Sequence, residues 1–248
     1  MKKESITNVE TINVAYQKDV SRRKFLSYAG LSAAGMVVLA CQDPYLALNK
    51  QRPPDNLPNK NPHDKPKEEV NLGSGDIGIL NYAYALEQLE AAFYIQVLTT
   101  PYSGITAKEM EYLTDIRDHE IAHREFFRNV LGARAIGSLG VDFSSITFSS
   151  RDSVLGTAKA FEDLGVSAYN GAGQLIADPN YLLYAGKIVS VEARHAAAIR
   201  DLISYGSFAD GTVVNAMGLD VVRSPQEVLA IAKTYITTLI NAENLPTS

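Results

Sequence analysis

Two Glu-x-x-His patterns occur in the sequence, one at Glu120 and His123 and the other at Glu192 and His195. Residues three apart lie on the same face of a helix. Apolar residues recur at helical spacing around each pair, so both pairs should face a core, where polar groups without partners are costly. Two buried pairs of this kind indicate one shared site.

Each pair follows a segment that has an inward glutamate of its own, Glu87 before the first pair and Glu162 before the second. Tyr94 stands seven residues after Glu87, and Tyr169 stands seven after Glu162. This spacing is two helical turns on one face. We therefore interpret this part of the chain as an internal repeat of two helix pairs.

A metal site is the chemistry that this set of side chains favours. In a four-helix bundle, a glutamate from each of two helices and a Glu-x-x-His from each of the other two form a dinuclear site. Two divalent cations would balance the four carboxylates, which without metal would repel one another in the core. The predicted ligands are Glu87, Glu120, His123, Glu162, Glu192 and His195.

The helices that must hold these residues are bounded by local signals. Thr106 and Glu109 form a capping box, Asp178 precedes a proline at a helix start, and Gly132 ends a helix. The loops are short, long and short, which is typical of an all-α four-helix bundle with one long crossover between helices 2 and 3. The predicted helices cover about 76–98, 106–132, 152–176 and 178–206.

A fifth helix is predicted after the bundle, within the accessory region 207–248. Ser224 and Glu227 form its capping signature, and we expect it to run to about Thr238. It contains no candidate ligand, so we expect it to cover the bundle that residues 74–206 form.

The segments 80–94 and 191–195 make the chain resemble the ferritin-like superfamily of diiron and dimanganese bundles, especially a branch with desiccation-related and bacterial envelope proteins. The resemblance implies two iron ions, or alternatively two manganese ions, bridged by Glu120 and Glu192. It also implies an oxidoreductase that oxidises Fe(II) or consumes peroxide, with dioxygen or hydrogen peroxide as partner. Glu90, one turn from Glu87, is an alternative ligand.

Two tyrosines and the residues before each Glu-x-x-His are further features of the predicted site. Tyr94 and Tyr169 are candidate catalytic residues, or core tyrosines with a hydrogen-bonded hydroxyl. The family often has an acid before the glutamate of each Glu-x-x-His, holding a ligand imidazole. Here those positions are His119 and Val191, and His119 is expected to point off the apolar stripe. No residue that orients the histidines is therefore identified.

A non-catalytic function is the alternative hypothesis. The resemblance to desiccation-related proteins also fits a lipid-anchored stress protein of the envelope, in which the metal site is structural or vestigial. The residues alone fit both an enzyme and a non-catalytic protein.

The first 73 residues are predicted to lie outside the fold. Residues 21–26 resemble a twin-arginine export signal, and 38–41 resemble a lipobox that ends in Cys41, the only cysteine. We expect a signal segment over 1–41 and a lipid anchor on Cys41 in the bacterial envelope; the alternative is an uncleaved signal anchor in which the thiol has no role. Residues 42–73 hold six of the ten prolines, which is typical of a flexible tether.

Charge and chain organisation limit the partners. The formal net charge is −5 with no basic patch, which argues against nucleic-acid binding. A lipidated end and a long tether fit poorly with a closed shell, so we expect a homodimer at most and not a storage cage.

Overall fold

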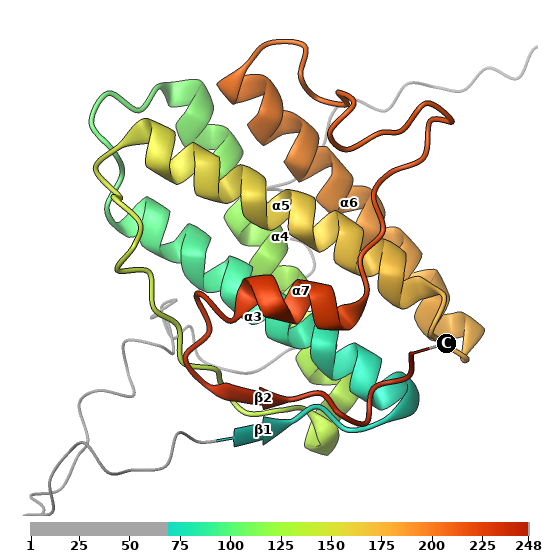
Figure 1. The fold of residues 1–248 in the computed structure, drawn as a ribbon. Coiled ribbons are helices and arrows are strands. Elements are labelled where there is room, and N and C mark those ends of the chain that lie inside the picture. Colours follow the sequence, from blue (N-terminus) through green and yellow to red (C-terminus); the bar gives the residue numbers. More distant parts are fainter. Residues whose placement is uncertain (1–68, 248) are drawn as a thin grey trace, which may run out of the picture. The chain divides into compact units, whose positions relative to one another are not determined.

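The computed structural model describes residues 69–247, which form the predicted all-α fold (Figure 1). Four long helices are followed by a short one, and two short strands lie beside them. The elements in chain order are β1 (Glu69–Asn71), α3 (Gly75–Thr99), α4 (Ala107–Leu131), the 3₁₀ helix η1 (Gly132–Arg134), α5 (Arg151–Gly173), α6 (Pro179–Ile203), α7 (Pro225–Ala232) and β2 (Leu239–Asn241).

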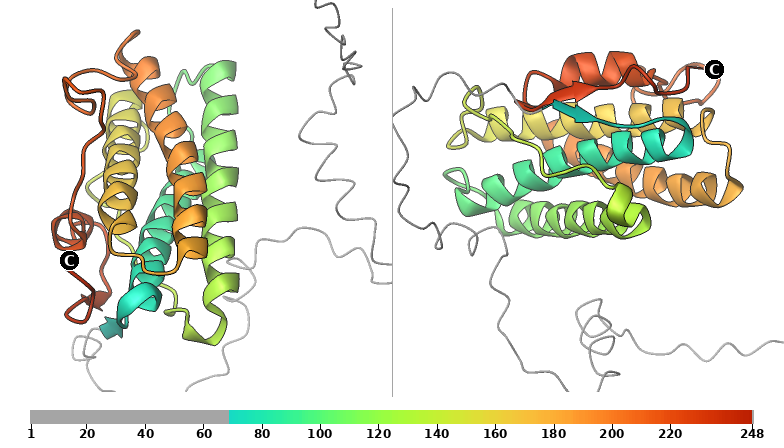
Figure 2. Two further views of the ribbon diagram at one scale, coloured as in Figure 1. Left: turned by 90° about the vertical axis from the view of Figure 1, so that its right-hand side faces the viewer. Right: turned by 90° about the horizontal axis from the view of Figure 1, so that it is seen from below.

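The long helices form a bundle in which each packs against two others (Figure 2). α3 packs against α4 and α5, and α6 packs against the same two helices. α4 and α5 therefore lie on a diagonal, and α5 begins at the opposite end of the bundle from the end of α4 (Figure 1). The long crossover 132–150 is needed to cover that distance, as the sequence predicted.

The ends of the long helices follow their local signals. The Thr106 hydroxyl accepts a hydrogen bond from the Glu109 amide, and the Glu109 carboxylate accepts one from the Thr106 amide, so the predicted capping box is present. Asp178 caps α6, and Gly132 ends α4 with a positive φ that favours glycine. These ends satisfy backbone groups that would otherwise have no partner.

The crossover is tied to α3 by one buried side chain. The Asn81 amide group donates to the carbonyls of Leu72 and Arg134, both at 3.0 Å, and its oxygen accepts from the Ile136 amide at 2.9 Å. These contacts fix the start of α3 against the end of α4. Glu87 lies in the same helix, so they also help to position the site.

The C-terminal region differs from the sequence prediction in one respect. The fifth helix, α7, ends at Ala232 instead of Thr238, and the chain continues into β2. Residues 236–240 are mostly β-branched, and such side chains lose rotamer freedom in a helix. β2 pairs in parallel with β1, which lies in the last part of the segment assigned to the tether. That part contains no proline.

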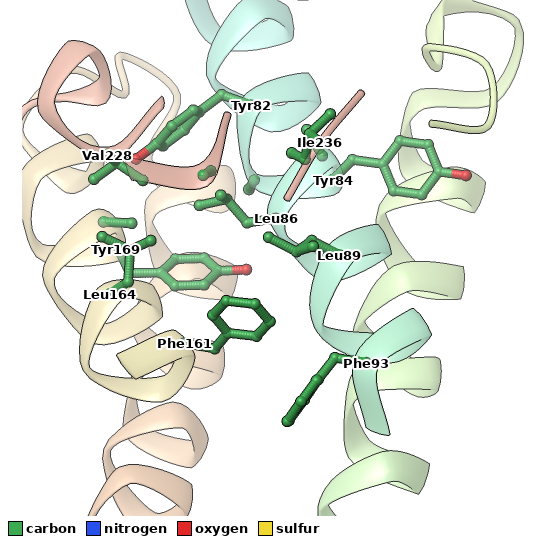
Figure 3. Packing of buried hydrophobic residues seen from close by; sticks show 14 of the residues in the cluster. Tyr82, Tyr84, Leu86, Leu89, Phe93, Phe161, Leu164, Tyr169, Val228 and Ile236 are labelled. Carbon is green, nitrogen blue, oxygen red and sulfur yellow. The ribbon is translucent and has the colours of Figure 1, made fainter. Parts of the chain in front are cut away.

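α7 packs against α5 and closes the core on that side (Figure 3). Its Val228 is fully buried and lies near Tyr82 of α3. Aromatic rings continue this core below it, with Phe161 edge-to-face against Phe93 at 5.1 Å and against Tyr235 at 4.9 Å between centroids. The accessory segment thus covers α3 and α5 from outside.

None of the helices within residues 69–247 is long and apolar enough to cross a membrane. The predicted signal segment 1–41, its Cys41, and most of the predicted tether lie outside the described residues.

Candidate metal centre

The structure brings all six predicted ligands together in the middle of the bundle. Glu87 comes from α3, Glu120 and His123 from α4, Glu162 from α5, and Glu192 and His195 from α6. The four glutamates have no exposed surface, and His195 is buried. His123 is the most exposed of the six, with 13% of its side chain reaching solvent.

The six residues form two overlapping groups whose donor atoms all lie within 4.8 Å of one another, and each group could hold a metal ion. Glu120 and Glu192 belong to both groups. Each of these two carboxylates could therefore contribute an oxygen to either group. The first group is Glu87, Glu120, His123 and Glu192, and the second is Glu120, Glu162, Glu192 and His195.

The distances around the two histidines follow the internal repeat. His123 Nδ1 lies 2.8 Å from Glu192 Oε1, 3.5 Å from Glu87 Oε2 and 3.7 Å from Glu120 Oε2. His195 Nδ1 lies 2.8 Å from Glu120 Oε1, 3.4 Å from Glu162 Oε2 and 3.8 Å from Glu192 Oε2. Each imidazole therefore faces its own helix partner, the shared glutamate of the other pair, and the single glutamate of the preceding helix.

These close approaches do not have the alignment of hydrogen bonds. Both Nδ1 atoms, both oxygens of Glu120 and Glu192, and one oxygen each of Glu87 and Glu162 are buried without a hydrogen-bond partner. Buried polar atoms are seldom left in this state. Donor atoms that point to common positions instead of at one another fit bound cations, which would satisfy them all.

The protonation of the centre shows the cost of burying these groups together. Burial and repulsion from Glu192 raise the pKa of Glu120 well above its usual range. Burial opposes ionisation of Glu192 too, but its contacts with His123 and His195 lower its pKa to about 2. Burial alone would lower the pKa of both histidines, yet the surrounding carboxylates raise it. The buried carboxylates and imidazoles therefore compensate one another only in part.

The two candidate tyrosines connect the halves of the repeat, because each donates a hydrogen bond to a glutamate of the other half. The Tyr94 hydroxyl of α3 donates to Glu162 of α5 at 2.5 Å, and the Tyr169 hydroxyl of α5 donates to Glu87 of α3. Burial and the neighbouring carboxylates raise the pKa of both tyrosines. Each hydroxyl therefore stays protonated and fixes the position of one carboxylate of the centre.

Glu90, the alternative ligand, belongs to neither of the two groups. It is buried beside the centre, where burial and repulsion from Glu192 raise its pKa. A side chain at Gly165 would place its Cβ 3.1 Å from Glu90 Oε1. Gly165 occupies the repeat position that corresponds to Glu90, so glycine on one helix leaves room for the additional acid on the other.

His119 contributes a contact that sequence reasoning missed. Its Nδ1 lies 2.9 Å from His195 Nε2, and the two rings are nearly parallel, with centroids 5.1 Å apart. The sequence placed His119 off the apolar stripe and identified no residue that orients the histidines, whereas in the structure His119 contacts His195. Its position directly before Glu120 was the signal in the sequence, because the family that the chain resembles often has an acid there that holds a ligand imidazole. Here an imidazole contacts the histidine of the other helix pair.

Comparison with known proteins agrees with this architecture. A family model described as a ferritin-like domain matches residues 75–205, which include all four long helices and all six converging side chains. No curated protein matches the chain.

Proposed function

Because the chain belongs to the family of ferritin-like domains, we propose that its bundle holds two divalent metal ions and acts as an oxidoreductase. The proposed reaction is the oxidation of Fe(II) or the consumption of peroxide. The observation that supports it best is the set of buried donor atoms from four helices that have no hydrogen-bond partner among the described residues. A bundle core without metal would gain nothing from such an arrangement.

We assign Glu87 and His123 to one metal ion, and Glu162 and His195 to the other. Glu120 and Glu192 belong to both groups of donors, so they would hold both ions. Carboxylate oxygens with imidazole nitrogens suit iron or manganese better than soft metals. We propose iron as the resident pair and manganese as the alternative.

The bound pair would supply electrons, since two Fe(II) that become Fe(III) provide the two electrons that reduce dioxygen to hydrogen peroxide or hydrogen peroxide to water. The residues of this chain exclude water and hold the ligands. Tyr94 and Tyr169 orient Glu162 and Glu87 through their hydroxyls. The sequence has one cysteine, so it offers no Cys-x-x-Cys pair for an additional iron that would transfer electrons.

We further propose that the protein works outside the cytoplasm. Its twin-arginine motif at 21–26 and the lipobox at 38–41 support export and lipid attachment at Cys41. Mass measurement of the mature protein would detect the lipid, and a Cys41→Ala variant should leave the membrane fraction.

Elemental analysis of the purified protein tests the metal assignment. We expect about two iron or manganese ions per chain, as a dinuclear site requires, with dioxygen or peroxide lost on addition of Fe(II). The double variant Glu192→Ala/His195→Ala should lose both the metal and the reaction. Glu111→Ala, at an exposed position of the same bundle, serves as the matched control. A stable, metal-free wild-type protein that consumes neither oxidant would favour a structural role instead.

A further inference from the structure

An apolar pocket lies at one end of the bundle, where α3 and α6 begin and α4 and α5 end. Its enclosed volume is about 10 Å³, room for one molecule about the size of water, and the hollow continues into open solvent. Every lining residue is aliphatic or aromatic. All four long helices contribute to its wall or to its rim, and the residues that decide its shape are Ala83, Phe126, Phe127, Tyr169, Ala172 and Ala185.

At the opposite end of the bundle, the corresponding positions have larger side chains. In the internal repeat, Ala172 of α5 corresponds to Val97 of α3, and Ala185 of α6 corresponds to Leu113 of α4. Val97 and Leu113 are both fully buried. The pocket therefore exists because two alanines stand where the other half has larger side chains.

The inner wall of the pocket borders one half of the metal centre. Ala83 lies one helical turn before Glu87, and Phe127 lies one turn after His123. Tyr169 has its ring in the pocket wall while its hydroxyl donates to Glu87. Any molecule in the pocket is thus within about one helical turn of the Glu87 and His123 side of the site.

The outer rim of the pocket reaches the surface. Tyr184 is 41% exposed, and its ring packs against half-buried Phe126 with centroids 5.2 Å apart. Both residues line the pocket. The part of the pocket that borders solvent is therefore lined by two aromatic rings, and this is the side from which a small molecule would enter.

The apolar wall of the pocket favours an apolar molecule over a polar one. Water and hydrogen peroxide need hydrogen-bond partners, which an apolar wall does not offer, and apolar cavities of proteins stay dry and bind apolar molecules or xenon. Dioxygen is small and apolar. We propose that this pocket binds dioxygen and delivers it to the Glu87–His123 half of the centre. The delivery rests on the function proposed above, whereas binding in the pocket does not require metal.

Xenon is the probe for binding, measured on the metal-free full-length chain by xenon NMR or in crystals under xenon pressure. Wild type should bind xenon between Ala172 and Ala185. Ala172→Val and Ala185→Leu, which introduce the side chains of the opposite end, should abolish it. Ala193→Leu, exposed on the same helix α6, should bind like wild type. Thermal melting shows whether each variant folds, and Ala185→Val is a smaller replacement if leucine prevents folding. Absence of xenon from the wild-type pocket would overturn the proposal.

Oxygen dependence of Fe(II) oxidation is the probe for delivery. Filling the pocket should raise the dioxygen concentration for half-maximal rate by roughly fivefold or more, with metal content unchanged, because the site would lose its apolar entry. An unchanged oxygen dependence in a variant that no longer binds xenon would overturn delivery. If wild type binds xenon but neither retains metal nor oxidises Fe(II), the proposed function fails while the pocket stands as an apolar binding site.

Discussion

At the scale of single residues, the contact between His119 and His195 makes the two halves of the centre unequal. His195 Nδ1 faces the carboxylates, so its Nε2 is the nitrogen that meets His119. An imidazole that binds metal through Nδ1 has its hydrogen on Nε2, and here that hydrogen can be donated to His119 Nδ1. The position before the other Glu-x-x-His is Val191, whose side chain has no polar atom.

We expect a His119→Ala variant to bind the metal ion at the Glu162 and His195 half roughly 10- to 100-fold more weakly, as is typical when a partner of a ligand is removed. Titration of metal-free protein with cobalt, followed by its absorption bands, measures this directly. His119→Gln keeps an acceptor near the same place and should recover part of the affinity. Identical titrations for wild type and His119→Ala would contradict a positioning role.

At the scale of elements, Gly171 allows the C-terminal segment to lie directly on α5. A Cβ at this position would meet the Arg223 carbonyl oxygen at 1.7 Å, so the two backbones touch. Arg223 also donates from its amide to the Ser167 carbonyl at 3.1 Å and from its guanidinium to the Ser167 hydroxyl at 2.7 Å. This contact leads the chain into α7, which covers the core.

A Gly171→Ala variant should therefore displace the segment around Arg223 and lower the free energy of unfolding by about 1–3 kcal/mol, as is usual for overpacking. Urea unfolding gives the loss in stability, and hydrogen exchange should show faster exchange at the Arg223 amide. Gly156→Ala is the matched control, because that glycine lies in the same helix with nothing near its missing side chain. It should be neutral or stabilise by about 0.5–1 kcal/mol. Equal behaviour of the two variants would argue against the close packing.

At the scale of the whole molecule, the buried carboxylates that would bind metal also lower the stability of the metal-free fold. Glu120 has a raised pKa in the folded chain, where burial is the main cause. A carboxylate of this kind is ionised at neutral pH when the chain is unfolded, so folding has to take up a proton or bury a charge. Its contribution at neutral pH is therefore destabilising, and it disappears as the pH falls below the unfolded pKa.

Bound metal should offset this loss of stability. With free metal at about 100 times the dissociation constant, binding to the folded state adds about 2.7 kcal/mol per site to the free energy of unfolding. Scanning calorimetry should show a corresponding rise in Tm on addition of metal, lost after chelation.

Glu120→Gln tests both sides of this balance. The metal-free variant should melt above metal-free wild type, because it no longer buries an ionisable group, and metal should no longer raise its Tm. Glu111→Gln, which changes an exposed glutamate of the same helix, should match wild type in both states. A Glu120→Gln variant that melts below metal-free wild type would show that the carboxylate stabilises the apo fold.

The sequence by itself predicted the four-helix bundle, most helix ends and the six residues that converge. Helical periodicity and capping act over a few neighbouring residues, so Thr106, Glu109 and the two Glu-x-x-His pairs could be interpreted locally. The tertiary structure alone decided the features that join distant segments. These are the contact of His119 with His195 and the position of Glu90 beside Gly165. The hydrogen bonds of the two tyrosine hydroxyls and the pairing of β1 with β2 are further examples. Each depends on how whole helices pack, and local sequence does not specify the distance between segments that are tens of residues apart.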